Sequence, residues 1–170
     1  MISRSFCLFL WLCILLILPA CAAEPIPALQ GTVTWIYDGD TLEIDTLGKV
    51  RLIGIDVPER ESSSRDSYLA NRGIATARQR EIYRAAKQFN ISQVKGQRVS
   101  LILDEPPRDR HGRLLAYVYL PDGRLLNRLL IEQGLAVVYR RFSFSMKDDF
   151  IAAETMAKRD GVGMWAGISP

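Results

Sequence analysis

Two short acidic motifs in the first third of the chain hold residue types suited to metal-assisted chemistry. They are Asp38-Gly39-Asp40-Thr41 and Gly54-Ile55-Asp56-Val57-Pro58-Glu59. Carboxylates and backbone carbonyls are the ligands that Ca²⁺ prefers. If the segments between the motifs pair as antiparallel strands, Asp40 at the start of one strand lies near Asp56 at the end of the other. Asp40, Asp56 and the carbonyl of Val57 are therefore candidate ligands of a divalent cation.

Three further charged residues could complete a site that cuts a phosphodiester. Glu59 follows Asp56 by three positions and could act as a base for water. Arg51 lies inside the apolar segment VRLIGI, and Arg113 directly precedes the apolar segment LLAYVYL. A planar guanidinium can bind two phosphate oxygens at once, so both arginines are candidate phosphate ligands.

The aspartates and the two arginines also have an ordinary structural explanation. Asp-Gly pairs favour hairpin turns, so Asp38 and Asp40 could serve only the turn, and Asp56 could only cap a strand end. Arg51 and Arg113 could lie on the solvated surface. The residue types alone leave both interpretations open, and the order of the motifs along the chain favours the functional one.

The segments that carry these residues alternate in the way expected of strands. Three strands are predicted over 32–37, 41–46 and 49–55, and two more over 98–104 and 114–120. Five strands with one helix after the third suit an OB-type Greek-key barrel, an α+β fold that is mainly barrel. A generic α+β sheet fits the same pattern.

About three helices are predicted to pack on this barrel, over 68–89, 125–133 and 147–159. Gly73 weakens the beginning of the first helix, which is expected to begin or kink there. A short extended piece is predicted at 137–138. The buried face of the first helix is expected to comprise Ile74, Ala77, Ile82, Ala85, Ala86 and Phe89.

Residues 1–20 are typical of a secretory signal, with an almost wholly apolar run from Phe6 to Leu18. That run is shorter than the roughly 20 apolar residues of a spanning helix. Leu18-Pro19-Ala20-Cys21 resembles a bacterial lipoprotein signal, in which Cys21 would be lipidated and anchor the protein to a membrane. Cleavage after Ala22 or Ala23, or an uncleaved anchor, are the alternatives. A linker over 21–30 and a single domain over 31–168 are predicted.

Cysteine content bears on the location of the protein, and charge bears on how it could bind phosphate. Cys7 and Cys13 would be removed with the signal, which leaves Cys21 without an intramolecular partner and points to its modification. The chain carries a formal net charge of +3, and only one basic residue and no acid fall within residues 1–20. Phosphate binding must therefore come from locally placed arginines. We expect an exported protein, either an outer-membrane or periplasmic lipoprotein of a bacterial cell envelope or a secreted one.

Taken together, the motifs resemble those of the staphylococcal (micrococcal) nuclease family, the thermonucleases. The resemblance covers about residues 33–165 and rests on YDGDT, VRLIGIDVPE, DRHGRLLAYVYL, PDGRLLNRLLIEQGLA and GMWAG in this order. It implies an OB-fold barrel with helices and one Ca²⁺ as cofactor. It also implies hydrolysis of DNA and RNA with little sequence specificity, leaving 3′-phosphate ends. We expect the protein to act as a monomer.

The resemblance assigns the metal site residue by residue. Asp40 and Asp56 match the family's calcium-ligating carboxylates, and Val57 matches a position that ligates through its backbone carbonyl. Asp38 and Thr41 match neighbours of the metal site.

The catalytic positions are assigned in the same way. Glu59 matches the proposed general base, and Arg51 and Arg113 match the two phosphate-binding arginines. His111 replaces a tyrosine that lies over the nucleotide, and Tyr139 is retained near a second aromatic position. His111 and Tyr139 are therefore weaker candidates for substrate contact.

Some segments depart from the family pattern. The stretch 60–72 is rich in serine and arginine instead of containing lysine, and Arg141 replaces a tyrosine. These differences affect base stacking and loop contacts. Two other interpretations remain: a catalytically inactive OB-fold module that binds nucleic acid, and an anchored envelope protein whose barrel binds a protein or glycan.

Overall fold

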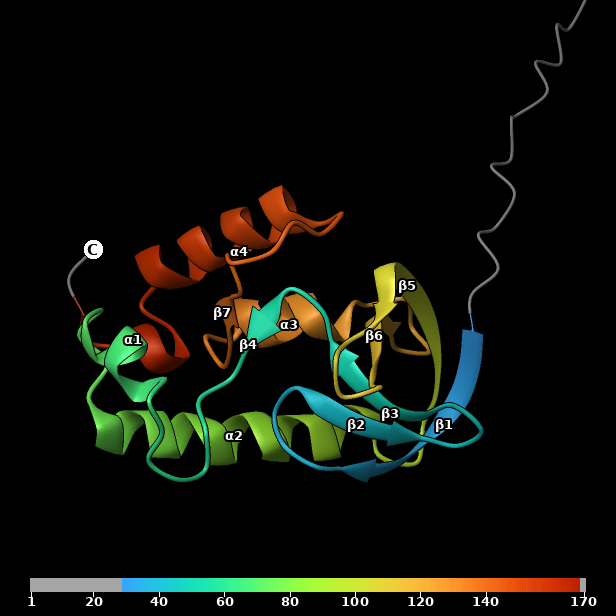
Figure 1. The fold of residues 1–170 in the computed structure, drawn as a ribbon. Coiled ribbons are helices and arrows are strands. Elements are labelled where there is room, and N and C mark those ends of the chain that lie inside the picture. Colours follow the sequence, from blue (N-terminus) through green and yellow to red (C-terminus); the bar gives the residue numbers. More distant parts are fainter. Residues whose placement is uncertain (1–28, 169–170) are drawn as a thin grey trace, which may run out of the picture.

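Five strands close into a barrel in the computed structural model, which describes residues 29–168 (Figure 1). They run in the order β1-β2-β3-β6-β5 around the barrel, and β1 also pairs with β5. The β3–β6 pair is parallel and the other barrel pairs are antiparallel. This confirms the predicted five-stranded OB-type barrel. The strands are β1 (Leu29–Ile36), β2 (Thr41–Ile44), β3 (Gly48–Leu52), β5 (Arg98–Arg108) and β6 (Leu114–Tyr119).

Strand alternation places apolar side chains inside the barrel and one candidate site residue outside it. In β3, Val50 and Leu52 are buried, while Arg51 between them is partly exposed. Successive side chains of a strand point to opposite faces, so Arg51 lies on the outer face of the barrel. The β2–β3 register pairs Thr41 with Arg51, and the Leu52 N–H donates to the Asp40 carbonyl at 2.8 Å, so Asp40 lies beside the end of β3.

The predicted strand over 49–55 is wrong in its extent, because the chain leaves the barrel after Leu52. Gly54 has φ +79°, a left-handed conformation that favours glycine and breaks the strand. The chain continues as β4 (Ile55–Asp56), which pairs antiparallel with β7 (Val137–Val138). This turn carries Asp56 away from the barrel wall toward the helices.

The predicted helix over 68–89 consists of two helices, α1 (Asp66–Ala70) and α2 (Thr76–Val94). Gly73 separates them with φ +83°. The predicted buried face is also partly wrong. Ala77 and Ala85 are exposed, whereas the polar residues Gln79 and Asn90 are fully buried beside Ile82, Ala86 and Val94.

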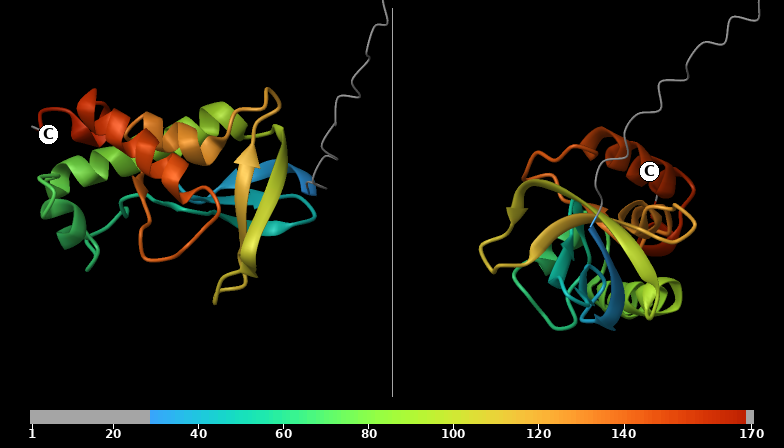
Figure 2. Two further views of the ribbon diagram at one scale, coloured as in Figure 1. Left: turned by 90° about the horizontal axis from the view of Figure 1, so that it is seen from above. Right: turned by 90° about the vertical axis from the view of Figure 1, so that its right-hand side faces the viewer.

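The helices gather at one end of the barrel, as the two further views in Figure 2 show. The short helix α3 (Leu126–Glu132) packs against α4 (Lys147–Arg159), and a 3-10 turn, η1 (Gly163–Trp165), follows. No helix within residues 29–168 combines the length and apolar character needed to cross a membrane. The predicted signal over 1–20, Cys21 and most of the predicted linker lie outside the described residues.

Candidate active site

The β1–β2 turn is held in place by α2. The Oδ1 atom of Asp38 accepts a hydrogen bond from the Asp40 N–H at 2.9 Å, and Asn90 of α2 donates to the Gly39 carbonyl at 2.9 Å. A Cβ on Gly39 would lie 2.5 Å from Cγ1 of Val57. Gly39 is therefore required by close packing, and this packing brings Asp40 next to Val57. Burial, and then the charge of Asp40, raise the pKa of Asp38 to about 6.

Asp40 is buried and connects the turn to both candidate arginines. Its Oδ2 atom accepts a hydrogen bond from the Val57 N–H at 3.2 Å and pairs with Nη1 of Arg51. Its Oδ1 atom accepts from the Thr41 hydroxyl at 3.2 Å. The same hydroxyl accepts from Nη1 of Arg113 at 3.3 Å. Thr41 thus links Asp40 to Arg113.

The Arg51 guanidinium bridges the two acidic motifs. Nη1 pairs with Asp40, while Nη2 lies 3.3 Å from Oδ1 of Asp56 and 3.0 Å from the Ile55 carbonyl. Asp40 and Asp56 lie on either side of this one cation, so the two motifs meet as predicted. The turn at Gly54 and the β4–β7 pair, not the pairing of β2 with β3, place Asp56 there. Because both carboxylates contact a single planar group, their oxygens converge on a small region of space.

Arg113 is oriented by an acid in the loop between β5 and β6. Nε and Nη2 of Arg113 lie 2.8 and 2.7 Å from Oδ2 of Asp109, whose Oδ1 accepts from the Arg113 N–H at 3.1 Å. Burial acts to raise the pKa of Asp109, but the hydrogen bonds from Arg113 outweigh it and lower that pKa. A charged Asp109 therefore holds Arg113 with Nη1 directed at Thr41.

Glu59 contacts an arginine that the sequence did not single out. Nη1 of Arg65 lies 2.5 Å from Oε1 of Glu59, and Nη2 of the same guanidinium pairs with Oδ1 of Asp56. Burial and the charge of Asp40 raise the pKa of Glu59, while Arg51 acts to lower it. Glu59 thus belongs to the same charge network as the two aspartates, with Arg65 between them.

Four residues outside the predicted set position this site: Asn90, Asp109, Arg65 and Arg80. Arg80 of α2 binds both the carbonyl of Glu59 and the carboxylate of Asp66, which closes the loop between β4 and α1. The richness of residues 60–72 in serine and arginine was the one sequence signal that pointed to Arg65.

The two weaker candidates lie at the rim of the site. His111 is exposed in the β5–β6 loop, where its N–H donates to Asp109 at 2.9 Å. The Tyr139 ring packs against Phe142 with 5.4 Å between centroids, and its N–H donates to the Gly54 carbonyl at 2.9 Å. Tyr139 therefore sits beside the turn that leads into β4.

The donor set of the predicted metal site fits a hard divalent cation. Asp40, Asp56 and the Val57 carbonyl offer oxygen ligands only, which suits Ca²⁺. Both carboxylates already face one positive group, Arg51. Across the part of the chain that the structure describes, no group of three or more His, Cys, Asp or Glu side chains is placed to hold a metal. The predicted ligands include only two carboxylate side chains, those of Asp40 and Asp56. The nearby Glu59 carboxylate contacts Arg65 instead.

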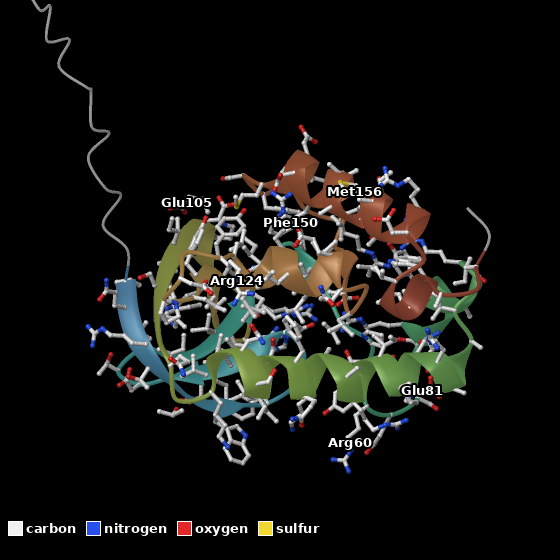
Figure 3. All side chains as sticks on the ribbon, turned by 180° about the vertical axis from the view of Figure 1, so that it is seen from behind. Arg60, Glu81, Glu105, Arg124, Phe150 and Met156 are labelled. Atoms are coloured by element: carbon white, nitrogen blue, oxygen red, sulfur yellow. The ribbon has the colours of Figure 1, made fainter. Side chains whose placement is uncertain are left out.

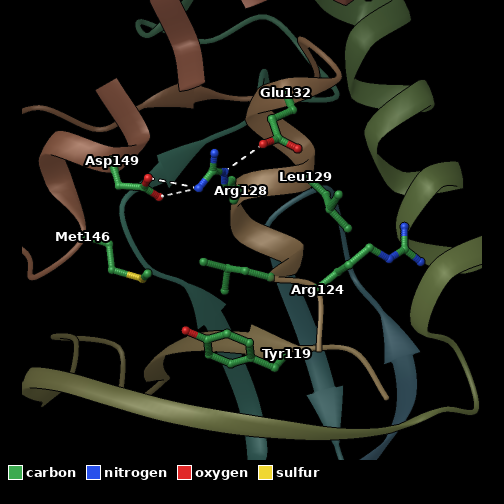
Figure 4. A pocket seen from close by; sticks show the side chains of 8 residues that line it. Tyr119, Arg124, Arg128, Leu129, Glu132, Met146 and Asp149 are labelled. Carbon is green, nitrogen blue, oxygen red and sulfur yellow. Dashed lines mark hydrogen bonds and ion pairs between the residues drawn. The ribbon is translucent and has the colours of Figure 1, made fainter. Parts of the chain in front are cut away.

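A separate pocket of about 350 Å³ lies between β6, α3 and α4 (Figure 4). Tyr119, Leu129 and Met146 line it together with charged residues. Its Arg128 is already paired with Glu132 at 2.7 Å and with Asp149 at 3.0 Å. This pocket shares no residue with the acid-and-arginine site described above.

The order of the strands around the barrel, with α2 inserted along the chain between β3 and β5, defines an OB-fold protein. Its site of acids and arginines lies on the outer face of the barrel. Comparison with known proteins makes the assignment more specific. The model of the family described as staphylococcal nuclease homologue matches residues 49–167. The chain therefore belongs to the staphylococcal nuclease family. The match contains Arg51, Asp56, Glu59 and Arg113 and begins after Asp40.

The chain is also similar to individual proteins. An uncharacterized protein of Methanocaldococcus jannaschii is 33% identical over 147 residues, covering 79% of this chain and 70% of its own. The endonuclease YncB of Bacillus subtilis is 33% identical over 142 residues, covering 79% of this chain and 61% of its own. A thermonuclease of Staphylococcus intermedius is 36% identical over 104 residues, or 59% of this chain and 54% of its own.

Proposed function

We propose that this protein is a calcium-dependent nuclease that hydrolyses DNA and RNA with little sequence specificity and leaves 3′-phosphate ends. The observation that carries the proposal is the convergence of Asp40 and Asp56 on Arg51, with Arg113 tied to Asp40 through Thr41. Membership of the staphylococcal nuclease family supports it, as do relatives named endonuclease and thermonuclease.

In this proposal the two arginines stabilise charge on the phosphoryl oxygens, and Glu59 accepts a proton from the attacking water. A cation held by Asp40, Asp56 and the Val57 carbonyl supplies further positive charge at the phosphate. Arg113 is suited to binding phosphate because Asp109 fixes the orientation of its guanidinium before substrate binds. This lowers the entropy cost of ordering the side chain on binding.

The expected lack of sequence specificity follows from the kind of contact proposed. Contacts to phosphate oxygens carry no sequence information. The Tyr139–Phe142 pair could stack on a base of single-stranded substrate, and stacking tolerates any base. His111 at the rim could add a polar contact to the substrate.

The test is cleavage of single-stranded DNA by the purified protein in calcium and in a chelator. Calcium-dependent cleavage is expected, and the double variant Glu59→Ala, Arg113→Ala should be inactive. The 3′-phosphate is checked by extending the products with a terminal transferase, which should succeed only after phosphatase treatment. Full activity in the chelator or in the double variant would refute the proposal. Binding of DNA without cleavage would favour the inactive OB-fold module.

We also propose that the protein is exported and anchored through a lipid on Cys21. Support comes from the apolar run 6–18 followed by Leu18-Pro19-Ala20-Cys21, and from Cys21 being the first cysteine after that run. Cys21→Ser should release the protein from the membrane fraction and change its processing. A variant that stays membrane-bound and is processed at the same place would contradict lipidation.

A further inference from the structure

Arg65 occupies the space between two carboxylates of the proposed nuclease site. One guanidinium nitrogen pairs with Oδ1 of Asp56 and the other lies 2.5 Å from Oε1 of Glu59. Arg51 approaches the same Asp56 oxygen at 3.3 Å. That oxygen is therefore shared between two arginines, one from the barrel and one from the loop after β4.

The two arginines differ in how firmly they are held. The side chain of Arg51 is 15% exposed and that of Arg65 is 48% exposed. Arg51 also donates to the backbone carbonyl of Ile55 in β4. Because half of the Arg65 side chain already faces solvent, it can leave the site with little loss of apolar packing.

The loop that carries Arg65 is nevertheless fixed at both ends. Arg80 of α2 binds the Glu59 carbonyl at one end and the Asp66 carboxylate at the other. Gln79, also from α2, donates to the Asp66 carbonyl at 3.0 Å. The Arg65 backbone therefore stays beside the site when its side chain moves, so the guanidinium remains able to return.

We propose that Arg65 is a built-in counter-cation that competes with the divalent cation for Asp56 and, in the same contact, keeps Glu59 paired. This inference rests on the proposed function and adds a residue that sets cation affinity. A guanidinium and a divalent cation repel one another when they share one carboxylate oxygen, and this repulsion is strong where solvent is partly excluded. Arg65 must therefore leave Asp56 before the site is loaded.

The same movement releases Glu59. While paired, the Oε1 atom of Glu59 accepts a charge-assisted hydrogen bond from Arg65, so this oxygen is not free to contact a water. Departure of one side chain thus opens a ligand and frees the proposed base together. Arg65 acts as a positioning residue, because it works through Asp56 and Glu59.

Calcium affinity of the purified full chain, measured by titration calorimetry, tests this inference without relying on activity. Arg65→Ala should bind calcium about tenfold more tightly than wild type, a coupling of ordinary size between linked sites. Arg60→Ala is the matched control, since it removes the same charge from the same loop. Arg60 is exposed and points away from the body of the protein beside α2 (Figure 3), so its variant should stay within about twofold of wild type.

Three further measurements separate the possible outcomes. Arg65→Lys retains the charge without the two-pronged contact and should have an affinity between wild type and Arg65→Ala. Urea denaturation should show one cooperative transition for Arg65→Ala, Arg65→Lys and Arg60→Ala, which establishes that each variant is folded. Asp56→Asn should abolish calcium binding.

If Arg65→Ala and Arg60→Ala bind calcium equally while Asp56→Asn does not bind, the inference about Arg65 is wrong and the proposed metal site stands. If wild type binds no calcium, or Asp56→Asn binds it normally, the proposed metal site is wrong and the inference fails with it. A weaker affinity in Arg65→Ala would also overturn the inference, because Arg65 would then support the site.

Discussion

Glu154→Gln removes a buried charge that ties α4 to the strand beside the site. The Glu154 side chain is 1% exposed. Its Oε1 atom accepts from the Val138 N–H at 2.9 Å, and Oε2 lies 2.7 Å from Nη2 of Arg140 and 2.9 Å from Nζ of Lys158. Val138 pairs with Ile55 in β4, so this carboxylate supports the strand that leads to Asp56.

The expected loss of stability in Glu154→Gln depends on the interactions that Arg140, Lys158 and Val138 lose. Removing one member of a buried ion pair costs about 3–5 kcal/mol when the other charge stays buried. Arg140 and Lys158 are about a third exposed, so water replaces much of what Glu154 gave them. Glutamine can still accept the hydrogen bond from Val138. We therefore expect a loss of about 2 kcal/mol in the free energy of unfolding at pH 7, or about 6 °C in Tm.

The loss should depend on pH in a defined direction. Burial acts to raise the pKa of Glu154, but hydrogen bonds from Arg140 and Lys158 outweigh it and lower the pKa below its usual value. A carboxylate with a lowered pKa stabilises the fold above its unfolded pKa, about 4.3, and this contribution disappears as the pH falls through the folded pKa. The difference between wild type and Glu154→Gln should therefore shrink at pH values below about 4.

Urea denaturation of both proteins between pH 7 and pH 3 measures this difference. The matched control is Glu132→Gln, because Glu132 pairs with Arg128 and both side chains are about 40% exposed. An exposed pair of this kind contributes at most about 1 kcal/mol. A Glu154→Gln variant as stable as wild type at pH 7, or one whose deficit stays constant down to pH 3, would refute this account of α4.

Three substitutions test the site itself. Thr41→Val removes the hydroxyl between Asp40 and Arg113 and should lower kcat/KM about tenfold on single-stranded DNA, the effect of one hydrogen bond to a charged group. Arg113→Lys removes the two-pronged donor and should lower kcat about 10²–10³-fold at an unchanged urea midpoint; a near-normal rate would exclude the proposed role. Gly39→Ala forces a Cβ against Val57 and should cost about 1–3 kcal/mol in urea denaturation, which adding Val57→Ala should partly restore.

The barrel and the position of Asp40 at the end of β3 could be predicted because both depend on strand pairing. Alternating apolar residues define the strands, and an antiparallel β2–β3 pair necessarily brings the residue before Thr41 close to the end of β3. The contact of Arg51 with Asp40 follows from that register, whereas its contact with Asp56 depends on the turn at Gly54 that separates β3 from β4. The catalytic and metal-binding roles of these residues remain predictions.

The exit of the chain from the barrel could not be predicted from hydrophobicity. The segment VRLIGI is apolar apart from Arg51, because Ile53 packs against the core and Ile55 is buried in the β4–β7 pair instead of in the barrel wall. Gly54 was the sole local sign of the break, and one glycine is compatible with a continuous strand.

The polar side of α2 and the partner of Glu59 depend on contacts between distant segments. Gln79 and Asn90 are buried because loop carbonyls need donors there: Gln79 donates to the Ile74 carbonyl and Asn90 to the Gly39 carbonyl. A helical-wheel argument treats such residues as solvent-facing. Arg65 likewise meets Asp56 and Glu59 only because Arg80 closes the intervening loop.

Opposite charges alternate through the site, from Asp40 through Arg51, Asp56 and Arg65 to Glu59. A buried carboxylate without a partner would destabilise the fold severely, and here each acid has a guanidinium beside it. The folded arrangement of acids is thus compatible with a protein that carries no cation, since the arginines supply the positive charge. If the proposed metal site is correct, an arriving cation exchanges for existing contacts instead of creating the structure. Its affinity would then depend on the release of Arg65 from Asp56 as well as on the oxygens that bind the cation.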